Sequence, residues 1–429
     1  MTEQRILIRD LSAHIGADVC ISGRVFAVRK LGGIFFMIVR DYTGTVQTVW
    51  DVDPQVGVGD VLTVCGRTKK DDRAAQGVEI EGRTCVWKNR LVEPLPFDLS
   101  KSDVNLQLTT LLDWRTISLR HPKVSAIFRL YDMLLSAYEQ GMRAEGFTEV
   151  KTPKILETSS EGGANFFKMS YFDKSAYLAQ SPQFYKQIMV GVFERVFEIG
   201  STFRAEPHFT TRHVNEYISL DAEMGFIGSF RDVTAMLTRI VRRMFTEIAT
   251  HGAEYLAMYG VDAPTVPDEI PHIKLAEMRT ILQTRYRYAI PEDTDIDPEG
   301  ERLACQYAKE EFGSDFVFLT HYPWSMRPFY TMPDPENPEE TCGFDLSFRG
   351  IEVATGSQRI HEANALAENM RKKGVTPTGM EFYVDVFKYA MPPHGGWGMG
   401  SERLIQQLLG LGSSKEAVLF PRDVKRLSP

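Results

Sequence analysis

Residues 203–213 read FRAEPHFTTRH and directly follow an apolar run of the chain. The stretch places Arg204 and Arg212 eight residues apart, together with Glu206 and His213. Arginine is permanently charged, and its planar group matches carboxylates and phosphates in two-pronged hydrogen bonds. The stretch therefore predicts a turn that clamps a polyanion, although a surface loop with weak ion pairs would explain the same residues.

A second polar cluster lies in DLSFRGIEVATGSQRIHE, residues 345–362. Glu352 and Thr355 stand three residues apart beside a glycine, and Arg359 follows. Mg²⁺ takes few protein ligands and completes its shell with water and substrate phosphates, so this pair suits it. The alternative is that Glu352 is an ordinary solvated strand residue.

A third segment, MPPHGGWGMGSERL at residues 391–404, contains four glycines. Glycine lets the backbone approach a ligand closely, and Arg403 stands where SERLIQQLLGL predicts a helix. The alternative is a glycine-rich turn that leads into a core helix.

A fourth pair of segments reads SSEGGANFF at 159–167 and LAQSPQFYKQ at 178–187. It supplies Glu161, Gln183 and Lys186, and a lysine beside amides suits a small molecule that carries a carboxylate. A helix start with proline in its first turn explains the second segment equally well.

The composition is that of an ordinary globular protein, with 43% hydrophobic and 25% charged residues among 429. The five cysteines show no CxxC spacing, so we expect buried thiols in a reducing compartment rather than a zinc site or disulfides. There is no apolar stretch of about 18 residues, and the N-terminus is too polar for a signal peptide. We therefore expect a cytoplasmic protein without a membrane partner.

The first hundred residues contain five short strand-like runs separated by turn signals. This pattern predicts a five-stranded OB-type barrel at 1–98, a fold that commonly binds oligonucleotides. A linker at 99–120 then leads to an α+β domain at 121–429, whose antiparallel sheet is flanked by helices. Residues 382–390 (FYVDVFKYA) are expected to form one of its strands, and 228–320 a connecting region. Neither a Rossmann nor a P-loop fingerprint is present.

Together, these segments resemble the motifs of class II aminoacyl-tRNA synthetases. Residues 203–213 resemble motif 2, residues 396–404 resemble motif 3, and the helix leading to EVKTPKIL, with Pro153, resembles motif 1. Four further segments are similar to those of the aspartyl branch of that family: QSPQFYKQ, RPFYTM, GSQRIH and YAMPPHGG. The short distance from motif 2 to GIEVATGSQR matches its compact archaeal and eukaryotic type.

The resemblance implies ATP and Mg²⁺ as cofactors, L-aspartate as substrate and a tRNA partner. Arg204 and Arg403 would be the catalytic arginines, and Glu352 with Thr355 the metal pair, where serine is more usual than threonine. The implied ATP-binding residues are Arg204, Glu206, Arg212, His213, Val214, Glu352, Gly400, Ser401, Glu402 and Arg403. The implied aspartate-binding residues are Glu161, Gln183, Lys186, Arg204, Thr355 and Arg359. Pro153 would lie at the interface of a homodimer.

The barrel of this family reads the anticodon. Phe36 matches the position that stacks on a base, and Arg29 and Gln47 match positions that contact bases or backbone. Strand alternation places Phe35 and Phe36 on opposite faces, so one of them faces outward. Phe26 stands where the family often has tryptophan or histidine, which leaves open whether tRNA-Asn is accepted besides tRNA-Asp.

The implied reaction joins aspartate to ATP as an adenylate and then transfers the aspartyl group to tRNA. No protein nucleophile is required, because positioning and charge stabilisation carry the rate. Three alternatives are an asparaginyl-tRNA synthetase, a synthetase-like asparagine synthetase without the barrel, and an inactive RNA-binding relative. Lys186 and Arg359 have no acidic partner within their own motifs, and a neutral amide would leave both cations poorly paired.

Overall fold

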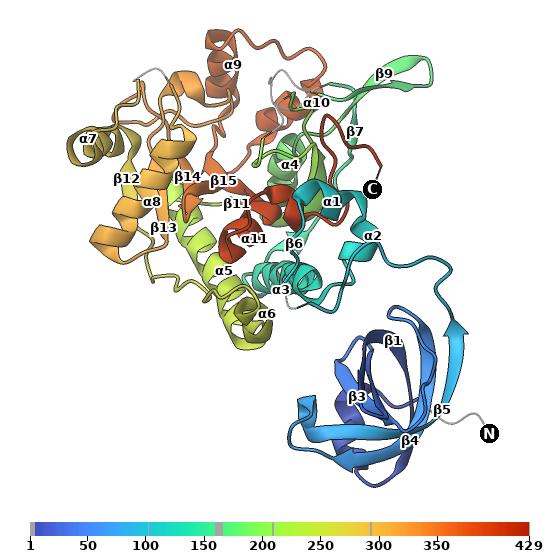
Figure 1. The fold of residues 1–429 in the computed structure, drawn as a ribbon. Helices are drawn as coiled ribbons and strands as arrows, with labels where there is room; N and C mark the ends of the chain where they lie inside the picture. Colours follow the sequence, from blue (N-terminus) through green and yellow to red (C-terminus); the bar gives the residue numbers. More distant parts are fainter. Residues whose placement is uncertain (1–4, 102, 159–165, 208–209, 292–293, 429) are drawn as a thin grey trace. The chain divides into compact units, whose positions relative to one another are not determined.

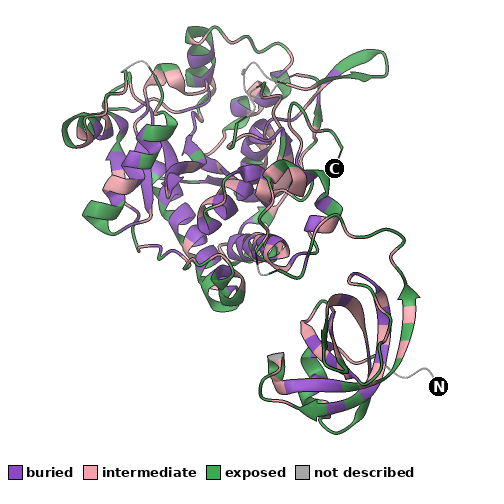
Figure 2. Cartoon of the chain, in the orientation of Figure 1, coloured by how far each residue is buried: buried purple, intermediate pink, exposed green. Residues whose placement is uncertain are grey.

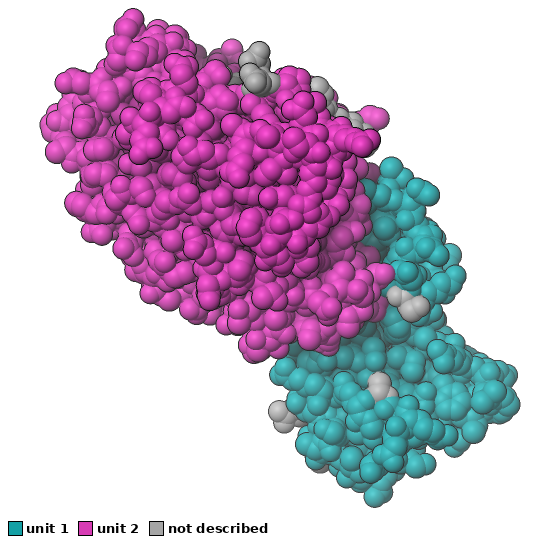
Figure 3. Space-filling view, turned by 90° about the vertical axis from the view of Figure 1, so that its left-hand side faces the viewer, with its two compact units in different colours: residues 1–121 teal, residues 122–429 magenta. Residues whose placement is uncertain are grey.

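The structure is a computed structural model that describes residues 5–101, 103–158, 166–207, 210–291 and 294–428. The chain divides into two compact units, residues 1–121 and 122–429 (Figure 3). Each unit has its own hydrophobic core.

Unit 1 is a closed five-stranded barrel with the strand order β1-β2-β3-β5-β4, which confirms the expected OB fold. All neighbouring strands are antiparallel except β3 and β5, which run parallel. Its interior is filled by side chains such as Val25, Met37, Val39 and Ile80, which alternate with outward-facing residues. The strands are β1 (Asp18–Leu31), β2 (Ile34–Arg40), β3 (Thr45–Trp50), β4 (Val61–Lys70) and β5 (Val78–Asn89).

The barrel contains a disulfide between Cys20 and Cys65, so the expectation of thiols throughout is wrong for this pair. The two residues face each other in the register of β1 and β4, with 4.1 Å between their Cα atoms. That spacing is near the one typical of directly opposed residues in an antiparallel pair, which brings two cysteines into bonding range. Cys85, Cys305 and Cys342 are free.

Unit 1 also includes two short helices, α1 (Leu108–Asp113) and α2 (Arg115–Ser118), within the segment predicted as a linker. Unit 2 is built on an eight-stranded sheet with the order β12-β13-β14-β15-β16-β11-β10-β6 (Figure 1). Its inner strands are antiparallel, and only the edge strands β12 and β6 pair in parallel. The bounds are β12 (His272–Lys274), β13 (Phe316–Thr320), β14 (Gly343–Phe348), β15 (Ile351–Gln358), β16 (His394–Gly400), β11 (Glu216–Gly225), β10 (Arg195–Phe203) and β6 (Thr148–Glu149).

Three helices supply most of the helical residues of the main core that buries the central strands of this sheet, which are purple in Figure 2. They are α3 (Pro122–Ala144), α5 (Phe230–His251) and α11 (Ser401–Leu409). The other helices are α4 (Gln183–Phe193), α6 (Ala253–Ala257), α7 (Leu275–Tyr286), α8 (Pro298–Phe312), α9 (Ala363–Lys372) and α10 (Glu381–Val384). A small separate sheet has the order β7-β9-β8, with β7 (Ile155–Leu156), β8 (Lys168–Tyr171) and β9 (Lys174–Leu178). Among the described helices, none is long and apolar enough to span a bilayer.

The strand predicted at 382–390 is wrong, because this segment forms α10 and the 3₁₀ helix η4 (Asp385–Tyr389). Tyr383 and Phe387, four residues apart, are both buried, whereas Phe382 and Tyr389 are exposed. That spacing is helical, and it decided the local structure over the strand propensity of the aromatic residues.

The glycine-rich segment before α11 is not a turn but the central strand β16. Its glycines allow close strand packing. A Cβ on Gly396 would lie 2.0 Å from the carbonyl oxygen of Ala222 and 2.3 Å from Glu223 Oε2.

Candidate active site

Residues of the first three polar segments and of LAQSPQFYKQ (178–187) line one cavity of about 270 Å³ in unit 2. The floor of this cavity comes from the neighbouring strands β11, β15 and β16, and α4 contributes from the side. The lining includes these predicted site residues: Gln183, Lys186, Arg204, Glu206, Arg212, His213, Val214, Glu352, Thr355, Arg359, Gly400, Glu402 and Arg403.

The loop that carries Arg204 and Arg212 connects β10 to β11. Its base is closed by a hydrogen bond from Arg204 N to Asn215 O, 3.0 Å long. The C-terminal segment of the chain holds the second half of this loop. Ser414 N donates to Thr211 O at 2.9 Å, and Asn215 N donates to Arg422 O at 2.7 Å. The loop is therefore tied at both ends over the cavity.

A β-bulge explains how Glu352 and Thr355 reach the same cavity. The register of β14 and β15 shifts between Leu346 and Ser347, so that one additional residue is accommodated in β15. As a result, Val353 and Ala354 are both buried in the core, and the residues on either side of them face the cavity. Residues three apart in a regular strand would point to opposite faces.

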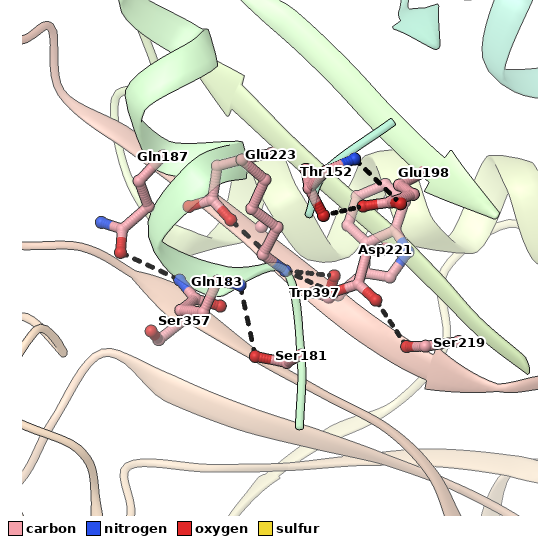
Figure 4. Close-up of polar contacts among 12 residues, drawn as sticks. Thr152, Ser181, Gln183, Gln187, Glu198, Ser219, Asp221, Glu223, Ser357 and Trp397 are labelled. Carbon is pink, nitrogen blue, oxygen red and sulfur yellow. Dashed lines mark hydrogen bonds and ion pairs between the residues drawn. The ribbon is translucent and has the colours of Figure 1, made fainter. Parts of the chain in front are cut away.

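Lys186 is buried and paired with two acidic residues, which lie outside its own motif. Its Nζ donates to Asp221 Oδ1 and to Trp397 O, both at 2.8 Å, and lies 3.6 Å from Glu223 Oε2. Figure 4 shows this cluster, with Asp221, Glu223 and Trp397 labelled. The acidic partners come from β11, outside the motif that carries the lysine.

Arg359 is held by Glu223, the carboxylate that also lies near Lys186. Its Nε donates to Glu223 Oε1 at 2.9 Å, its Nη1 to Ser357 Oγ at 2.6 Å, and its Nη2 to Gly396 O at 3.0 Å. Lys186, Arg359, Asp221 and Glu223 are all at most 4% exposed and together carry no net charge. Sequence reasoning missed the two acids, although their alternation in EYISLDAEMGF places them on one face of a strand.

The other arginines of the cavity are anchored by backbone and carboxylate oxygens. Arg403 Nη1 donates to Glu352 O at 2.9 Å, and Arg212 Nη1 donates to Glu301 Oε2 at 2.9 Å. Arg204 lies over the ring of Tyr217, with 5.8 Å from its guanidinium carbon to the ring centre. Tyr217 lines the cavity and was not singled out from the sequence.

The surroundings of Glu352 and Thr355 fit a hard cation. Burial and the nearby Asp345 carboxylate raise the pKa of Glu352 to about 7. Asp345 lies opposite Thr355 in the strand register, and its buried Oδ1 makes no hydrogen bond to any described residue. Arg327 donates to both, to Thr355 Oγ1 at 3.0 Å and to Asp345 Oδ2 at 2.7 Å. In the described part of the chain no three acidic, histidine or cysteine residues form a metal cluster, so protein ligands would be few.

Glu402 lines the cavity, but the side chains of Ser401 and Glu402 are engaged in contacts with α3 and β11. Glu402 is 4% exposed and accepts from Tyr131 Oη of α3 at 3.1 Å and from Ile218 N of β11 at 3.0 Å. Ser401 lies 2.8 Å from the same Tyr131 hydroxyl. Burial raises the pKa of Glu402 to about 7. These two residues join α11 to the α3 helix, and their contact with ATP stays a prediction.

In unit 1, the three predicted anticodon residues gather on one face of neighbouring strands. Phe36 of β2 pairs with Arg29 of β1, and Gln47 of β3 pairs with Ile38, two residues further along β2. Phe35 packs against the barrel core and Phe36 does not belong to it, as the alternation predicts. Gln47 Nε2 also donates to Glu79 Oε2 at 3.2 Å.

Two predicted site residues, Pro153 and Glu161, are not among the described residues that line the cavity. Pro153 is exposed on the segment between β6 and β7, and its place in a dimer interface stays a prediction. Glu161 lies outside the described residues.

Comparison with known proteins agrees with this geometry. The family model described as tRNA synthetases class II (D, K and N) matches residues 107–424, and a model of the OB-fold nucleic acid binding domain matches residues 19–84. The chain belongs to the class II tRNA synthetases of this D, K and N family.

Individual relatives match over almost the whole chain. An aspartate–tRNA(Asp/Asn) ligase of Deinococcus radiodurans is 43% identical and an aspartate–tRNA(Asp) ligase of Thermococcus kodakarensis is 40% identical. The matches cover 99% of both chains in the first case, and 96% of this chain and 97% of the relative in the second. A crystal structure of asparaginyl-tRNA synthetase from Pyrococcus horikoshii with asparaginyl-adenylate has a TM-score of 0.93 at 28% identity, with both chains covered completely.

Proposed function

We propose that this protein is an aspartate–tRNA ligase, which activates L-aspartate with ATP and transfers it to tRNA-Asp. The observation that carries the proposal is that Lys186 and Arg359 share one cavity with Arg204 and Arg403. The two named ligases above, similar over their full length, support aspartate as the amino acid.

The hydrogen-bond inventory of the buried cluster favours a carboxylate ligand. An ammonium has three donors and a guanidinium five. Within the described residues, Lys186 uses two donors and Arg359 uses four, so each keeps one. A carboxylate only accepts hydrogen bonds and can take both donors, whereas an amide would also bring an NH₂ group that needs acceptors.

The reaction needs positioned charge rather than a protein nucleophile. An α-carboxylate oxygen of aspartate attacks the α-phosphorus of ATP, a new P–O bond forms, and the bond to pyrophosphate breaks. A ribose hydroxyl at the tRNA 3′ end then attacks the aspartyl carbonyl and AMP leaves. Arg204 and Arg403 would stabilise the charge on the phosphoryl oxygens, and the face of Tyr217 offers a platform for the adenine ring.

Glu352 and Thr355, with Asp345 beside them, would hold Mg²⁺. The ion would neutralise phosphate charge when ATP is bound. Their ligating oxygens support this assignment, as does Asp345 Oδ1, which forms no hydrogen bond to the described residues. Glu206, Arg212, His213, Val214 and Gly400 would surround the nucleotide, and Gln183 would contact aspartate.

The barrel would bind the anticodon loop, with Phe36 stacking on a base between Arg29 and Gln47. We also propose a homodimer that uses the Pro153 segment and a cytoplasmic location, as the family resemblance implies. Acceptance of tRNA-Asn is a further proposal, since one relative is named for both tRNAs and another for tRNA-Asp alone.

Asparagine is the second candidate amino acid. Asp221 and Glu223 neutralise the two cations, so charge alone does not decide between the substrates, and asparaginyl-tRNA synthetase is a close structural neighbour. ATP–pyrophosphate exchange separates the candidates when each amino acid is offered alone. We expect exchange with aspartate and almost none with asparagine. Exchange with asparagine alone would establish the second candidate, and none with either would indicate an inactive relative.

A further inference from the structure

Glu301 is a buried carboxylate that lies outside all four segments recognised in the sequence. It belongs to the first turns of α8 in the region between motifs 2 and 3 and is 9% exposed. Its Oε2 accepts two hydrogen bonds, from Arg212 Nη1 at 2.9 Å and from Glu352 N at 3.3 Å. Glu301 therefore touches the β10–β11 loop and the β15 strand at once.

The two partners of Glu301 are themselves part of a longer chain of contacts. Arg212 Nη2 reaches Gly350 O at 3.4 Å, and Arg403 Nη1 donates to Glu352 O at 2.9 Å. The main chain of Glu352 is thus held at its N–H by Glu301 and at its carbonyl by Arg403. One carboxylate links a loop arginine, the strand that carries Glu352, and the arginine of α11.

We propose that Glu301 is a positioning residue for ATP, which orients Arg212 and the Glu352 backbone for the triphosphate. This role rests on the proposed function. A loop arginine has much rotamer freedom, and fixing it before the ligand arrives lowers the entropy cost of binding. Without Glu301, the Arg212 guanidinium would keep, among hydrogen bonds to the described residues, only its long contact to Gly350 O.

The position of Glu301 is well defined by its helix. Asp297 caps the N-terminus of α8 by accepting from Gly300 N at 2.8 Å, and Pro298 begins the helix. A negative group near a helix N-terminus is stabilised by the helix dipole. The rigid α8 thus presents the carboxylate to a loop residue far away in sequence.

Three variants test this role: Glu301→Ala, Glu301→Gln and the control Glu299→Ala. Both hydrogen bonds end on one oxygen, so glutamine can keep them while losing the charge. Glu299 lies on the same turn of α8, but pairs with Arg302 at the surface, with 47% of its side chain exposed. The measurements are Michaelis constants for ATP and aspartate in pyrophosphate exchange, and calorimetric titration with MgATP without aspartate.

We expect Glu301→Ala to raise both the Michaelis constant and the dissociation constant for ATP about tenfold, because a hydrogen bond between charged groups is lost. Glu301→Gln should stay within about threefold of the parent, the aspartate Michaelis constant should change less than twofold, and Glu299→Ala should match the parent. Unchanged ATP binding by Glu301→Ala, or an equal rise of both Michaelis constants, would overturn the role. A parent protein without exchange would instead overturn the proposed function and this role with it.

Discussion

The buried cluster around Lys186 shows how a single residue connects stability with substrate choice. Its ammonium lies between Asp221 and Glu223, and only 2% of Lys186 is exposed. Burying charges is costly, and the cost is met only while each charge keeps its partner.

Lys186→Met, which retains the apolar stem but not the charge, removes the cation that pairs with Asp221 and leaves Glu223 paired with Arg359. We expect the free energy of unfolding to fall by about 3–5 kcal/mol and exchange with aspartate to disappear. Urea unfolding and pyrophosphate exchange measure the two effects. Lys388→Ala, which breaks an exposed pair with Asp385, should leave the free energy of unfolding almost unchanged. A Lys186→Met protein as stable and active as its parent would contradict the assignment.

Phe36 and its neighbour Phe35 form a matched pair, because one lies off the barrel core and the other packs against it. Phe36→Ala should raise the Michaelis constant for tRNA about tenfold, since stacking contributes roughly 1–3 kcal/mol per base, and leave tRNA-free exchange unchanged. Phe35→Ala should instead lower the stability of the barrel. Aminoacylation kinetics and thermal unfolding separate these outcomes, and unchanged tRNA kinetics for Phe36→Ala would refute anticodon stacking.

Residue types predicted most of the site, but their partners did not follow from the sequence. Lys186 and Arg359 were expected from their motifs, yet Asp221 and Glu223 lie on a different strand and become neighbours only through the sheet order. Glu301 was missed for the same reason. Local patterns identify which groups carry chemistry, whereas tertiary packing decides which charges meet.

Among the secondary-structure elements, α11 is tied to α3 and β11 through Glu402. Its buried carboxylate accepts from Tyr131 and Ile218, and its pKa is raised to about 7. In the unfolded chain a glutamate titrates near ~4.3, so the folded state binds this proton more tightly. The group therefore contributes stability at low pH, and this contribution is lost as the pH rises through about 7.

Glu402→Gln keeps an acceptor oxygen for Tyr131 and Ile218 and removes the titration. We expect its free energy of unfolding, relative to that of the parent, to be about 3 kcal/mol higher at pH 8 than at pH 5. Urea unfolding at both pH values gives this difference directly. If the free energy of unfolding changes equally between pH 5 and pH 8 in both proteins, Glu402 does not titrate with a raised pKa.

The disulfide joins strands β1 and β4 and closes a loop of 45 residues. A cross-link of that length restricts the unfolded chain, so Cys20→Ser should lower the stability of the barrel by about 2–4 kcal/mol under oxidising conditions. Cys85→Ser serves as the control because Cys85 is unpaired. A thiol titration of the unfolded protein should count three free thiols, and a count of five would show that the bond does not form.

Element types were predictable where periodicity was clear. The barrel strands and the helices that begin at Pro122 and Ser401 follow their patterns. The prediction of a strand at 382–390 was wrong because it followed the strand propensity of aromatic residues, whereas the burial of Tyr383 and Phe387 follows a helical period. The bulge in β15 could not be predicted from the sequence, because a register shift depends on the partner strand.

At the scale of the whole molecule, a neutral barrel and an acidic catalytic unit belong to one tRNA synthetase chain. Residues 1–100 hold 13 basic and 13 acidic residues of the totals 49 and 57, so the remaining 36 and 44 account for the net charge of −8. The expected family and fold class are confirmed by the family models and by the strand topology. Aspartate was predicted from Lys186 and Arg359, whereas the acidic partners of these two cations follow only from the sheet order.

Aminoacylation with radiolabelled amino acids tests the central claim most directly. Transcripts of tRNA-Asp and tRNA-Asn are each offered with labelled aspartate or labelled asparagine, in the presence of ATP and Mg²⁺. We predict that aspartate is attached to tRNA-Asp and that asparagine is attached to neither tRNA. Aspartate on tRNA-Asn as well would add the double specificity named for the Deinococcus relative. Asparagine attached to tRNA-Asn, with no attachment of aspartate, would contradict the account.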